Sequence, residues 1–380
     1  MKYIILSLNA GGGHNAAANA IRDALVEQGA EAAVFDCLEI ASPLWSRAVC
    51  GTYLGIVKHI PCLFGAVYRL SFHLCGKRRK SVVYAASART AGRVSKFLRR
   101  EQPDGVIVTH IFAAQQLTYL RRHGEADLWT GGVITDYDVQ PFWNETELDR
   151  VYSPSRELSE SYAEKGTPRG LLVETGIPVD PTLREVSDTR AAKREAGLDP
   201  DRPCVLIAGG SMGAGKMPRT VEALLKGLTE NVQFLVVCGS NRRLKKRFAR
   251  MRIPESRMKV LGFVRPLHRL MRAADVVISK PGGLSSTEVF EQRIPLVAVH
   301  PILGVESNNA AYLKRQGAAL CPTTDAEIVE DVRRLLADPE LVEQIKRSQR
   351  NLVPGGASRE IARQIIQETT ARAANRKTPC

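Results

Sequence analysis

The chain has 380 residues, enough for two domains of ordinary size, and 44% of them are hydrophobic, which is sufficient for globular cores. Its formal net charge of +14 points to an anionic partner such as a membrane surface, a nucleic acid or a phosphorylated substrate. No apolar run approaches the roughly 20 residues that span a bilayer, and the eight cysteines form no Cys-x-x-Cys pair. The sequence shows no secretory signal. We therefore expect a cytoplasmic protein that binds peripherally to the cytoplasmic face of the membrane.

Short apolar runs alternate with helical patterns through both halves of the chain. Most runs are apolar throughout, which is typical of parallel strands covered on both faces. The predicted strands are 3–8, 33–36, 105–109, 131–135, 150–152 and 171–174, then 204–208, 233–237, 258–261, 276–279, 296–299 and 319–320. Two such series predict an α/β fold with two doubly wound, Rossmann-like domains.

A proline-containing segment separates the two series. Pro178 and Pro181 disfavour helix and interrupt the pattern. We place the boundary near residue 180, which gives an N-terminal domain over 1–180 and a C-terminal domain over 181–380. A last helical pattern, over 358–374, can pack on either domain.

The segment 41–100 contains no Asp or Glu and holds twelve Lys or Arg residues. Its first part, 43–74, mixes aromatic and aliphatic side chains with cations, as interfacial helices on anionic lipid do. The residues expected to face a membrane are Trp45, Phe64, Tyr68, Lys77, Arg78, Arg79 and Lys80. The alternative is an amphipathic core helix with a solvated basic end.

The first glycine loop, at 9–14, reads Asn-Ala-Gly-Gly-Gly-His, and it follows a predicted strand and opens a helix. Glycines such as Gly12 and Gly13 let a ligand approach the backbone, and a helix N-terminus favours negative charge. His14 stands at the mouth of this helix. A lone histidine is more often structural, but one that follows three glycines at the carboxyl end of a strand indicates a functional residue.

The second glycine loop, at 209–217, reads Gly-Gly-Ser-Met-Gly-Ala-Gly-Lys-Met. It approaches the Gly-x-x-x-x-Gly-Lys pattern of nucleoside triphosphatases, in which Ser or Thr follows the lysine and binds Mg²⁺. Met217 stands at that position. We therefore favour a loop that cradles phosphate without a Mg²⁺ ligand.

The third loop, at 280–288, reads Lys-Pro-Gly-Gly-Leu-Ser-Ser-Thr-Glu and follows a predicted strand. Its small residues begin a helix, so its backbone N–H groups can hold a pyrophosphate. Glu288 lies about one turn into this helix, where a carboxylate can hold a ribose diol or act only as a partner of the helix dipole. Glu306 and Asn309 follow the next strand, and a carboxylate with an amide is typical of sugar recognition.

Taken in order, these motifs resemble those of the diacylglycerol glucosyltransferase and monogalactosyldiacylglycerol synthase family. The motifs are Gly-Gly-Gly-His, Gly-Ile-Pro, Gly-Gly-Ser, Val-Cys-Gly-x-Asn, Gly-Phe-Val, Lys-Pro-Gly-Gly-x-x-x-x-Glu and Pro-x-x-Gly-x-Glu-x-x-Asn, over about residues 1–351. More distantly, the chain is similar to the transferase that adds N-acetylglucosamine to lipid-linked muropeptide. The resemblance implies a GT-B fold with a cleft between two Rossmann-like domains. It also implies inversion at the anomeric carbon, UDP-glucose or UDP-galactose as donor, and diacylglycerol as the expected lipid acceptor.

The resemblance also assigns roles by position. His14 or Asp136 would be the general base for the acceptor hydroxyl, with Gly12, Gly13 and Trp143 in the loops around it. The donor would be held by Gly210, Ser211, Asn241, Gly262, Phe263, Val264, Gly283, Leu284, Ser285, Ser286, Thr287, Glu288, Glu306 and Asn309. Of these, 262–264 would contact uracil, Ser211 and 283–287 phosphate, Glu288 the ribose, and Glu306 with Asn309 the sugar. Helix N-termini and side chains would stabilise the leaving UDP, so no metal cofactor is expected.

The chain departs from the family pattern at several positions. The family usually has histidine where Gln140 stands, often another where Asn144 and Glu145 follow Trp143, and glutamine where Val305 stands. The first two departures concern the acceptor and the base, and the third concerns the choice of sugar. The triplet at 136–138, Asp-Tyr-Asp, also matches the metal-binding signature of the other common glycosyltransferase fold, which the two-domain glycine-loop pattern contradicts.

Two other functions fit parts of the sequence. One is a catalytically silent, membrane-binding protein on the same scaffold. The joint presence of His14, Glu288 and Glu306 argues against this function, because a silent scaffold does not need them. The other is a transferase whose acceptor is a polyprenyl-linked saccharide, which likeness of fold cannot separate from a diacylglycerol acceptor. Nucleic-acid binding is disfavoured, because the basic segment contains no recognisable RNA or DNA motif.

Overall fold

The computed structural model describes residues 1–9, 12–41, 81–186, 188–210 and 216–377. The residues expected at a membrane, from Trp45 to Lys80, and the donor residue Ser211 lie outside these ranges. The chain forms two compact units. The first contains Met1–Pro181, Leu303–Val305 and Gly356–Cys380, and the second contains Thr182–Ile302 and Glu306–Gly355.

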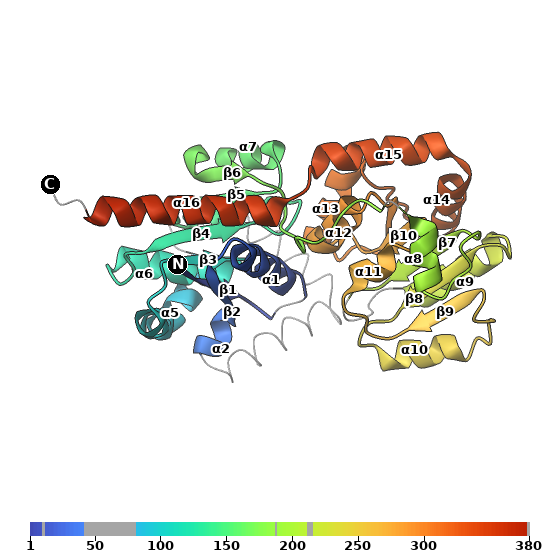
Figure 1. The fold of residues 1–380 in the computed structure, drawn as a ribbon, viewed down its shortest axis with the longest axis horizontal. Helices are drawn as coiled ribbons and strands as arrows, with labels where there is room; N and C mark the ends of the chain where they lie inside the picture. The colour runs from blue at the N-terminus through green and yellow to red at the C-terminus, as the bar shows by residue number, and fades with distance from the viewer. Residues whose placement is uncertain (10–11, 42–80, 187, 211–215, 378–380) are drawn as a thin grey trace. The chain divides into compact units, whose positions relative to one another are not determined.

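The first unit is built on a six-stranded parallel sheet with the order β2-β1-β3-β4-β5-β6 (Figure 1). The strands are β1 (Lys2–Ser7), β2 (Glu31–Asp36), β3 (Gly105–Val108), β4 (Trp129–Val133), β5 (Arg150–Ser153) and β6 (Leu172–Glu174). The helices are α1 (Gly12–Glu27), α2 (Cys37–Ala41), α5 (Val82–Glu101), α6 (Ile111–Arg122), α7 (Arg156–Glu164) and α16 (Ala357–Lys377), with short 3-10 turns η1 (Trp143–Glu145) and η2 (Arg169–Leu171). Because β1 pairs with β2 on one side and β3 on the other, the strand order reverses there, and open α/β sheets bind ligands at such a point.

The C-terminal helix α16 packs on the first unit, where Figure 1 shows it running along the sheet. Ile361 and Ile365 join the buried cluster formed by α1 and the sheet. The Thr369 hydroxyl lies 2.7 Å from the Tyr3 hydroxyl, and Trp129 donates to Glu368 over 2.9 Å. The last helical pattern therefore completes the core of the first unit.

The second unit is built on a five-stranded parallel sheet with the order β11-β10-β7-β8-β9. The strands are β7 (Cys204–Ala208), β8 (Gln233–Val237), β9 (Met258–Leu261), β10 (Val276–Ser279) and β11 (Leu296–Ala298). The helices are α8 (Thr189–Glu195), α9 (Met217–Gly227), α10 (Arg242–Ala249), α11 (Leu267–Met271), α12 (Gly283–Glu291), α13 (Val305–Arg315), α14 (Asp325–Ala337) and α15 (Pro339–Leu352). Its order also reverses, between β7 and β10, because β7 pairs with both β8 and β10.

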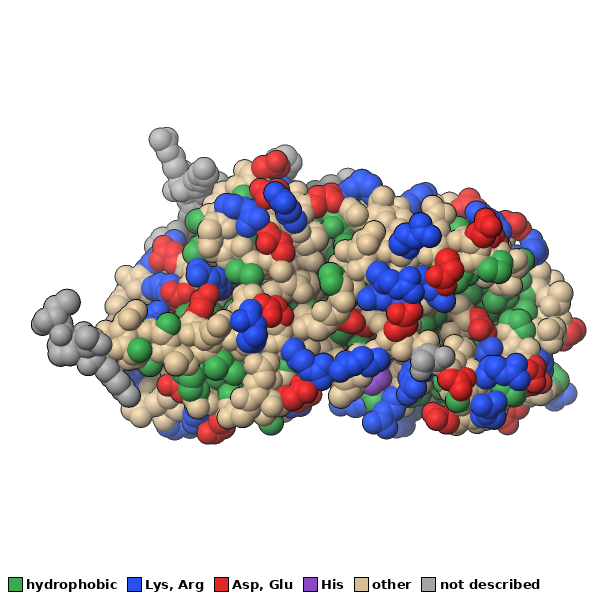
Figure 2. All heavy atoms as spheres, turned by 45° about the horizontal axis from the view of Figure 1, so that its top comes forward, with side chains coloured by type: hydrophobic (Ala, Val, Ile, Leu, Met, Phe, Trp, Pro, Cys, Tyr) green, Lys and Arg blue, Asp and Glu red, His purple; other side chains and the backbone are tan. Residues whose placement is uncertain are grey.

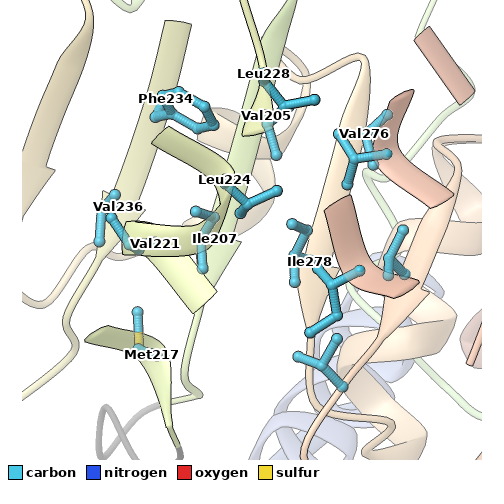
Figure 3. Close-up of a cluster of buried hydrophobic side chains, with 14 of the residues drawn as sticks. Val205, Ile207, Met217, Val221, Leu224, Leu228, Phe234, Val236, Val276 and Ile278 are labelled. Carbon is cyan, nitrogen blue, oxygen red and sulfur yellow. The ribbon is translucent and has the colours of Figure 1, made fainter. Parts of the chain in front are cut away.

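The core of the second unit lies between its sheet and the helices α9 and α14. Figure 3 shows Val221 and Leu224 of α9 beside the sheet residues Ile207 and Val236, all almost fully buried. The strands carry apolar side chains on both faces, as parallel strands with helices on each side require. Because helices cover both faces of the sheet, its strands appear in the sequence as continuous apolar runs.

All eleven longer strands predicted from the sequence are present, with ends that shift by two residues at most. The prediction of a twelfth, at 319–320, is wrong as a strand, because there is only an isolated bridge between Leu320 and Val297. Leu320 donates its backbone N–H to Leu296 and accepts from Ala298. One residue is therefore paired, and the chain then bends at Thr323 and Thr324 before α14.

Charges of both signs lie side by side on the face shown in Figure 2, where blue Lys and Arg groups stand beside red Asp and Glu groups. Among the ion pairs of the described residues, Arg363 pairs with Glu360 within α16, and Arg350 of α15 pairs with Glu185. In the part of the chain that the structure describes, no helix has the length and apolar character needed to cross a bilayer.

Candidate active site

His14 lies at the carboxyl edge of the first sheet, two residues into α1. Its Nδ1 atom is 2.7 Å from the carbonyl oxygen of Thr109, which follows β3, and 3.1 Å from the hydroxyl of Thr135, which follows β4. The imidazole is thus held by the residues that follow β3 and β4.

The tautomer of His14 follows from this geometry. A carbonyl oxygen can only accept, so Nδ1 carries the proton that it donates to Thr109, and Nε2 keeps a lone pair. Burial lowers the pKa of His14, although the Thr109 carbonyl acts in the opposite direction. The ring is therefore neutral at pH 7, with Nε2 available to accept a proton.

A second histidine borders His14. The His110 ring meets the His14 ring edge-on, with centroids 4.8 Å apart, and its Nδ1 accepts from the backbone N–H of Phe112 at the start of α6. Burial, with a smaller contribution from His14, holds the pKa of His110 well below its usual value. Since both rings are neutral, they do not repel one another at pH 7.

Asp136 reaches the same edge of the sheet, because it follows Thr135 directly. Its carboxylate accepts a hydrogen bond of 2.7 Å from Gln140 Nε2. The backbone N–H of Gln140 donates to the Tyr162 hydroxyl, which donates to the Asp138 carbonyl. Gln140, at a position where the resemblance leads us to expect histidine, therefore fixes the carboxylate in place.

Trp143 is buried and 2% exposed. Its indole lies against Gly132 of β4, and its Nε1 is 3.5 Å from the Gln140 side-chain oxygen. Packing against the strand leaves this side chain little surface for a ligand. Trp143 thus supports the loop that carries Gln140.

In the second unit, the third glycine loop joins β10 to α12 as the sequence predicts. Gly282 is the N-cap of α12 and Gly283 its first residue, so backbone N–H groups at this end are not covered by a capping side chain. Leu284 and Thr287 are buried, Ser285 is half-buried, and the Thr287 hydroxyl donates to the Gly283 carbonyl. Ser286 Oγ is buried and has no hydrogen-bond partner among the described residues. This end of α12 offers N–H groups and a hydroxyl to an anion.

Lys280 is positioned between this loop and α13. Its Nζ lies 3.3 Å from Glu306 Oε1, and both side chains are largely buried. The other carboxylate oxygen of Glu306 accepts from the backbone N–H of Ile302 over 2.7 Å. Asn309, fully buried, donates to the Pro281 carbonyl over 3.0 Å and ties α13 to the same loop. Glu288 is half-buried on α12.

The remaining predicted donor residues follow other strands of the second sheet. Gly210, after β7, has φ +71°, which favours glycine. Gly262, Phe263 and Val264 follow β9, and Phe263 is 55% exposed with the Arg265 guanidinium 5.7 Å from its ring centre. The side chain of Asn241 caps α10 by accepting from Leu244. Met217, at the position that would bind Mg²⁺ in a nucleoside triphosphatase, is buried in the core.

Besides His110, three residues in these two sites were given no role from the sequence. Thr109 and Thr135 hold His14, and Lys280 holds Glu306. Thr109 and Thr135 are the last residues of predicted strands, and Lys280 directly follows one. This position is the signal that could have found them, because the polar residues after parallel strands gather at one sheet edge. The described residues contain no group of three or more His, Cys, Asp or Glu side chains arranged to hold a metal.

Comparison with known proteins gives the family. The profile of monogalactosyldiacylglycerol (MGDG) synthase matches residues 14–179, and that of the glycosyltransferase family 28 C-terminal domain matches residues 204–362. The processive diacylglycerol beta-glucosyltransferase of Bacillus licheniformis is 30% identical over 308 residues, which are 80% of this chain and 79% of that protein. The chain belongs to the diacylglycerol glucosyltransferase and MGDG synthase family.

A second relative and a solved structure agree with this assignment. The Bacillus subtilis protein of the same name is 28% identical over 383 residues, which cover 99% of this chain and 97% of that protein. The crystal structure of Acinetobacter baumannii MurG superposes with a TM-score of 0.60 at 16% identity, over 97% of this chain and all of that one. This member of the diacylglycerol glucosyltransferase family thus has the GT-B fold and is a glycosyltransferase.

Proposed function

We propose that the protein transfers a hexose from a UDP-sugar to the hydroxyl of diacylglycerol, with inversion at the anomeric carbon, and that the donor is UDP-glucose. The relatives are diacylglycerol beta-glucosyltransferases by name, which supports glucose as the sugar and diacylglycerol as the acceptor. The observation that carries the proposal within the structure is the His14 imidazole. It is neutral, held by a backbone carbonyl, and placed at the switch point of the first sheet in a chain whose second half matches family 28.

His14 is the proposed general base. Its Nε2 takes the proton of the acceptor hydroxyl while the hydroxyl oxygen attacks the anomeric carbon. The bond from that carbon to the UDP oxygen breaks, and its electron pair leaves with UDP. A base in this position contributes about 10²–10⁴ in rate. Asp136, fixed by Gln140, is the alternative base, and it otherwise orients the acceptor.

The second unit is proposed to bind the donor. The open N–H groups at the start of α12 and the Ser286 hydroxyl would hold the diphosphate, and Lys280 would balance its charge. Glu306 and Asn309 would read the sugar and Glu288 the ribose. Residues 262–264, after β9, would contact uracil, and Gly210 would allow Ser211 to approach phosphate. The α12 N–H groups, the Ser286 hydroxyl and the Lys280 ammonium are hydrogen-bond donors, and we propose that they stabilise the leaving UDP without a metal ion.

The acceptor lies in a membrane, and we propose that the basic segment 41–100 meets an anionic membrane surface on its cytoplasmic face. The described part of that segment is α5, where Arg89, Arg93, Lys96, Arg99 and Arg100 are exposed. The aromatic part, from Trp45 to Tyr68, and the Lys77–Lys80 cluster are expected to enter the interface. The sequence supports this assignment through the pairing of aromatic groups with cations.

The deciding experiment measures UDP release from UDP-glucose and UDP-galactose in parallel, with EDTA present, with and without vesicles that contain diacylglycerol. We expect release only with vesicles, from UDP-glucose, with the sugar recovered in the organic phase. UDP binding without release would reassign the acceptor, and polyprenyl-linked saccharides would be tested next. Absence of both release and UDP binding would leave only a silent scaffold.

A further inference from the structure

The helix α10 of the second unit is strongly basic on one face. Leu244 and Phe248 are buried and anchor it beside β9, where Figure 1 shows it at the outside of the sheet. At 100° per residue, Arg242, Arg243, Lys246 and Arg250 fall on the side opposite these two anchors. All four side chains are exposed. The outward face of α10 therefore presents cations and no large apolar side chain.

Few acidic groups of the described residues neutralise the cations of this helix. The segment 242–252 holds seven Lys or Arg residues and no Asp or Glu. Within the described ranges, one of them, Arg247, forms an ion pair, with Glu222 at 3.2 Å. By contrast, Arg333 and Arg334 on α14 each have an acidic partner one turn away. The charge on α10 is thus uncompensated.

Part of this charge also stands at the end of the helix where cations are unfavourable. Arg242 and Arg243 are the first two residues of α10, where the helix dipole favours acidic side chains. Asn241 already caps this end. Lys246 and Arg247 lie in the last turn, where the dipole favours cations, but Arg242 and Arg243 do not stabilise the helix. An external anionic partner accounts for these two residues better than local structure does.

We propose that the outward face of α10 is a second membrane-docking surface, which binds anionic lipid headgroups electrostatically. The absence of large apolar side chains on this face indicates contact with the membrane surface rather than insertion. The choice of a membrane over a nucleic acid rests on the proposed function, because a lipid acceptor brings the protein to a bilayer. The surface lies outside the segment 41–100, so it adds an attachment point in the sugar-binding unit.

The test uses the full chain and vesicles of phosphatidylcholine with or without phosphatidylglycerol, without diacylglycerol or UDP-sugar. The variant Arg243→Ser/Lys246→Ser/Arg250→Ser removes three outward cations and spares Lys245, which lies beside the Gly262 loop. The matched control, Arg333→Ser/Arg334→Ser/Arg347→Ser, removes the same charge from α14 and α15. We expect the first variant to lose affinity for anionic vesicles by about fivefold per cation, on the order of 100-fold at low salt, and the control to lose far less.

Two outcomes overturn the proposal. One is equal vesicle affinity of the two variants. The other is unchanged vesicle affinity in the α10 variant together with weakened binding of single-stranded RNA, which would assign the face to a nucleic acid. Sugar transfer by the α10 variant to detergent-dispersed diacylglycerol is measured in parallel. Its rate should match that of the unsubstituted chain, and such a match shows that the variant folds. If the unsubstituted chain and both variants all fail to transfer sugar, the proposed function is contradicted. Vesicle binding is measured without substrates, so its result does not depend on turnover.

Discussion

The Nδ1 atom of His14 and the carbonyl oxygen of Thr109 are 2.7 Å apart, and this single contact fixes the proton of the imidazole. The carbonyl belongs to the residue after β3, so the sheet itself orients the ring. A backbone acceptor cannot be protonated or rotate away, unlike a carboxylate side chain. The lone pair on Nε2 is therefore set by the fold before any substrate binds.

The first prediction concerns turnover against donor affinity. His14→Ala should lower kcat by about 10²–10⁴ and leave the Kd for UDP nearly unchanged, because the ring belongs to the first unit and acts only in proton transfer. Steady-state rates and calorimetric UDP titration measure the two quantities. Asp136→Ala provides the comparison, since a larger loss of kcat there would assign the base to Asp136. Equal losses of kcat and UDP affinity in both variants would contradict either assignment.

The second prediction concerns pH. Burial lowers the pKa of His14 below its ordinary value of about 6.5. A base must be neutral, so activity should be full above the lowered pKa and fall as the pH drops through it. The acid limb of kcat/KM should therefore lie below pH 6.5. A limb above pH 6.5 would mean that the ring is stabilised as a cation and does not have the role proposed here.

The third prediction concerns Gln140, which holds Asp136 over 2.7 Å. Gln140→Ala should lower kcat by about tenfold, because a hydrogen bond to a charged group contributes roughly 1.5–3 kcal/mol and part of it is replaced by water. The KM for UDP-glucose should not change. Gln140→His restores the residue usual in the family and can donate the same bond, so it should retain most of the activity. A fully active Gln140→Ala would show that Asp136 needs no such support.

The sequence predicts the sheets well and the contacts of the sites less well. Strands such as β7 and β10 are continuous apolar runs, which can be recognised from the local sequence without tertiary information. The role of Thr109 depends on β1 and β3 being neighbours, which joins residues 95 positions apart. The pairing of Lys280 with Glu306 likewise depends on the loop between β11 and α13. Local pattern predicts that polar residues reach a sheet edge, but the strand order decides which of them meet.

The fourth prediction separates phosphate from sugar recognition at Lys280 and Glu306. Lys280→Ala should weaken the binding of both UDP and UDP-glucose by about 10–100-fold, since it removes a largely buried cation proposed to face the diphosphate. Glu306→Gln should weaken the binding of UDP-glucose but not that of UDP, because the proposed partner of Glu306 is the sugar. The exposed Lys226→Ala is the control and should change neither. Calorimetric titration with the two ligands distinguishes the roles, and equal effects of Glu306→Gln on both ligands would place the carboxylate at the diphosphate instead.

The fifth prediction concerns Gly132 of β4 and the packing of Trp143. A Cβ at this glycine would lie 2.6 Å from the Trp143 ring and 2.8 Å from Leu148, and neither buried group can move freely. Gly132→Ala should therefore destabilise the protein by about 1–3 kcal/mol in urea unfolding. The control is Gly92→Ala on α5, where a Cβ meets nothing within 4 Å and the residue is exposed. That variant should gain roughly 0.5–1 kcal/mol from helix propensity.

The Gly132 variant should also lose activity beyond its loss of stability. A displaced Trp143 shifts the loop that carries Gln140, and with it the hydrogen bond to Asp136. We expect kcat to fall at temperatures where the variant is still fully folded, whereas UDP affinity, a property of the second unit, should hold. If kcat of the folded Gly132→Ala protein equals that of Gly92→Ala, Trp143 contributes to the core alone and the loop is positioned by the Tyr162 hydroxyl.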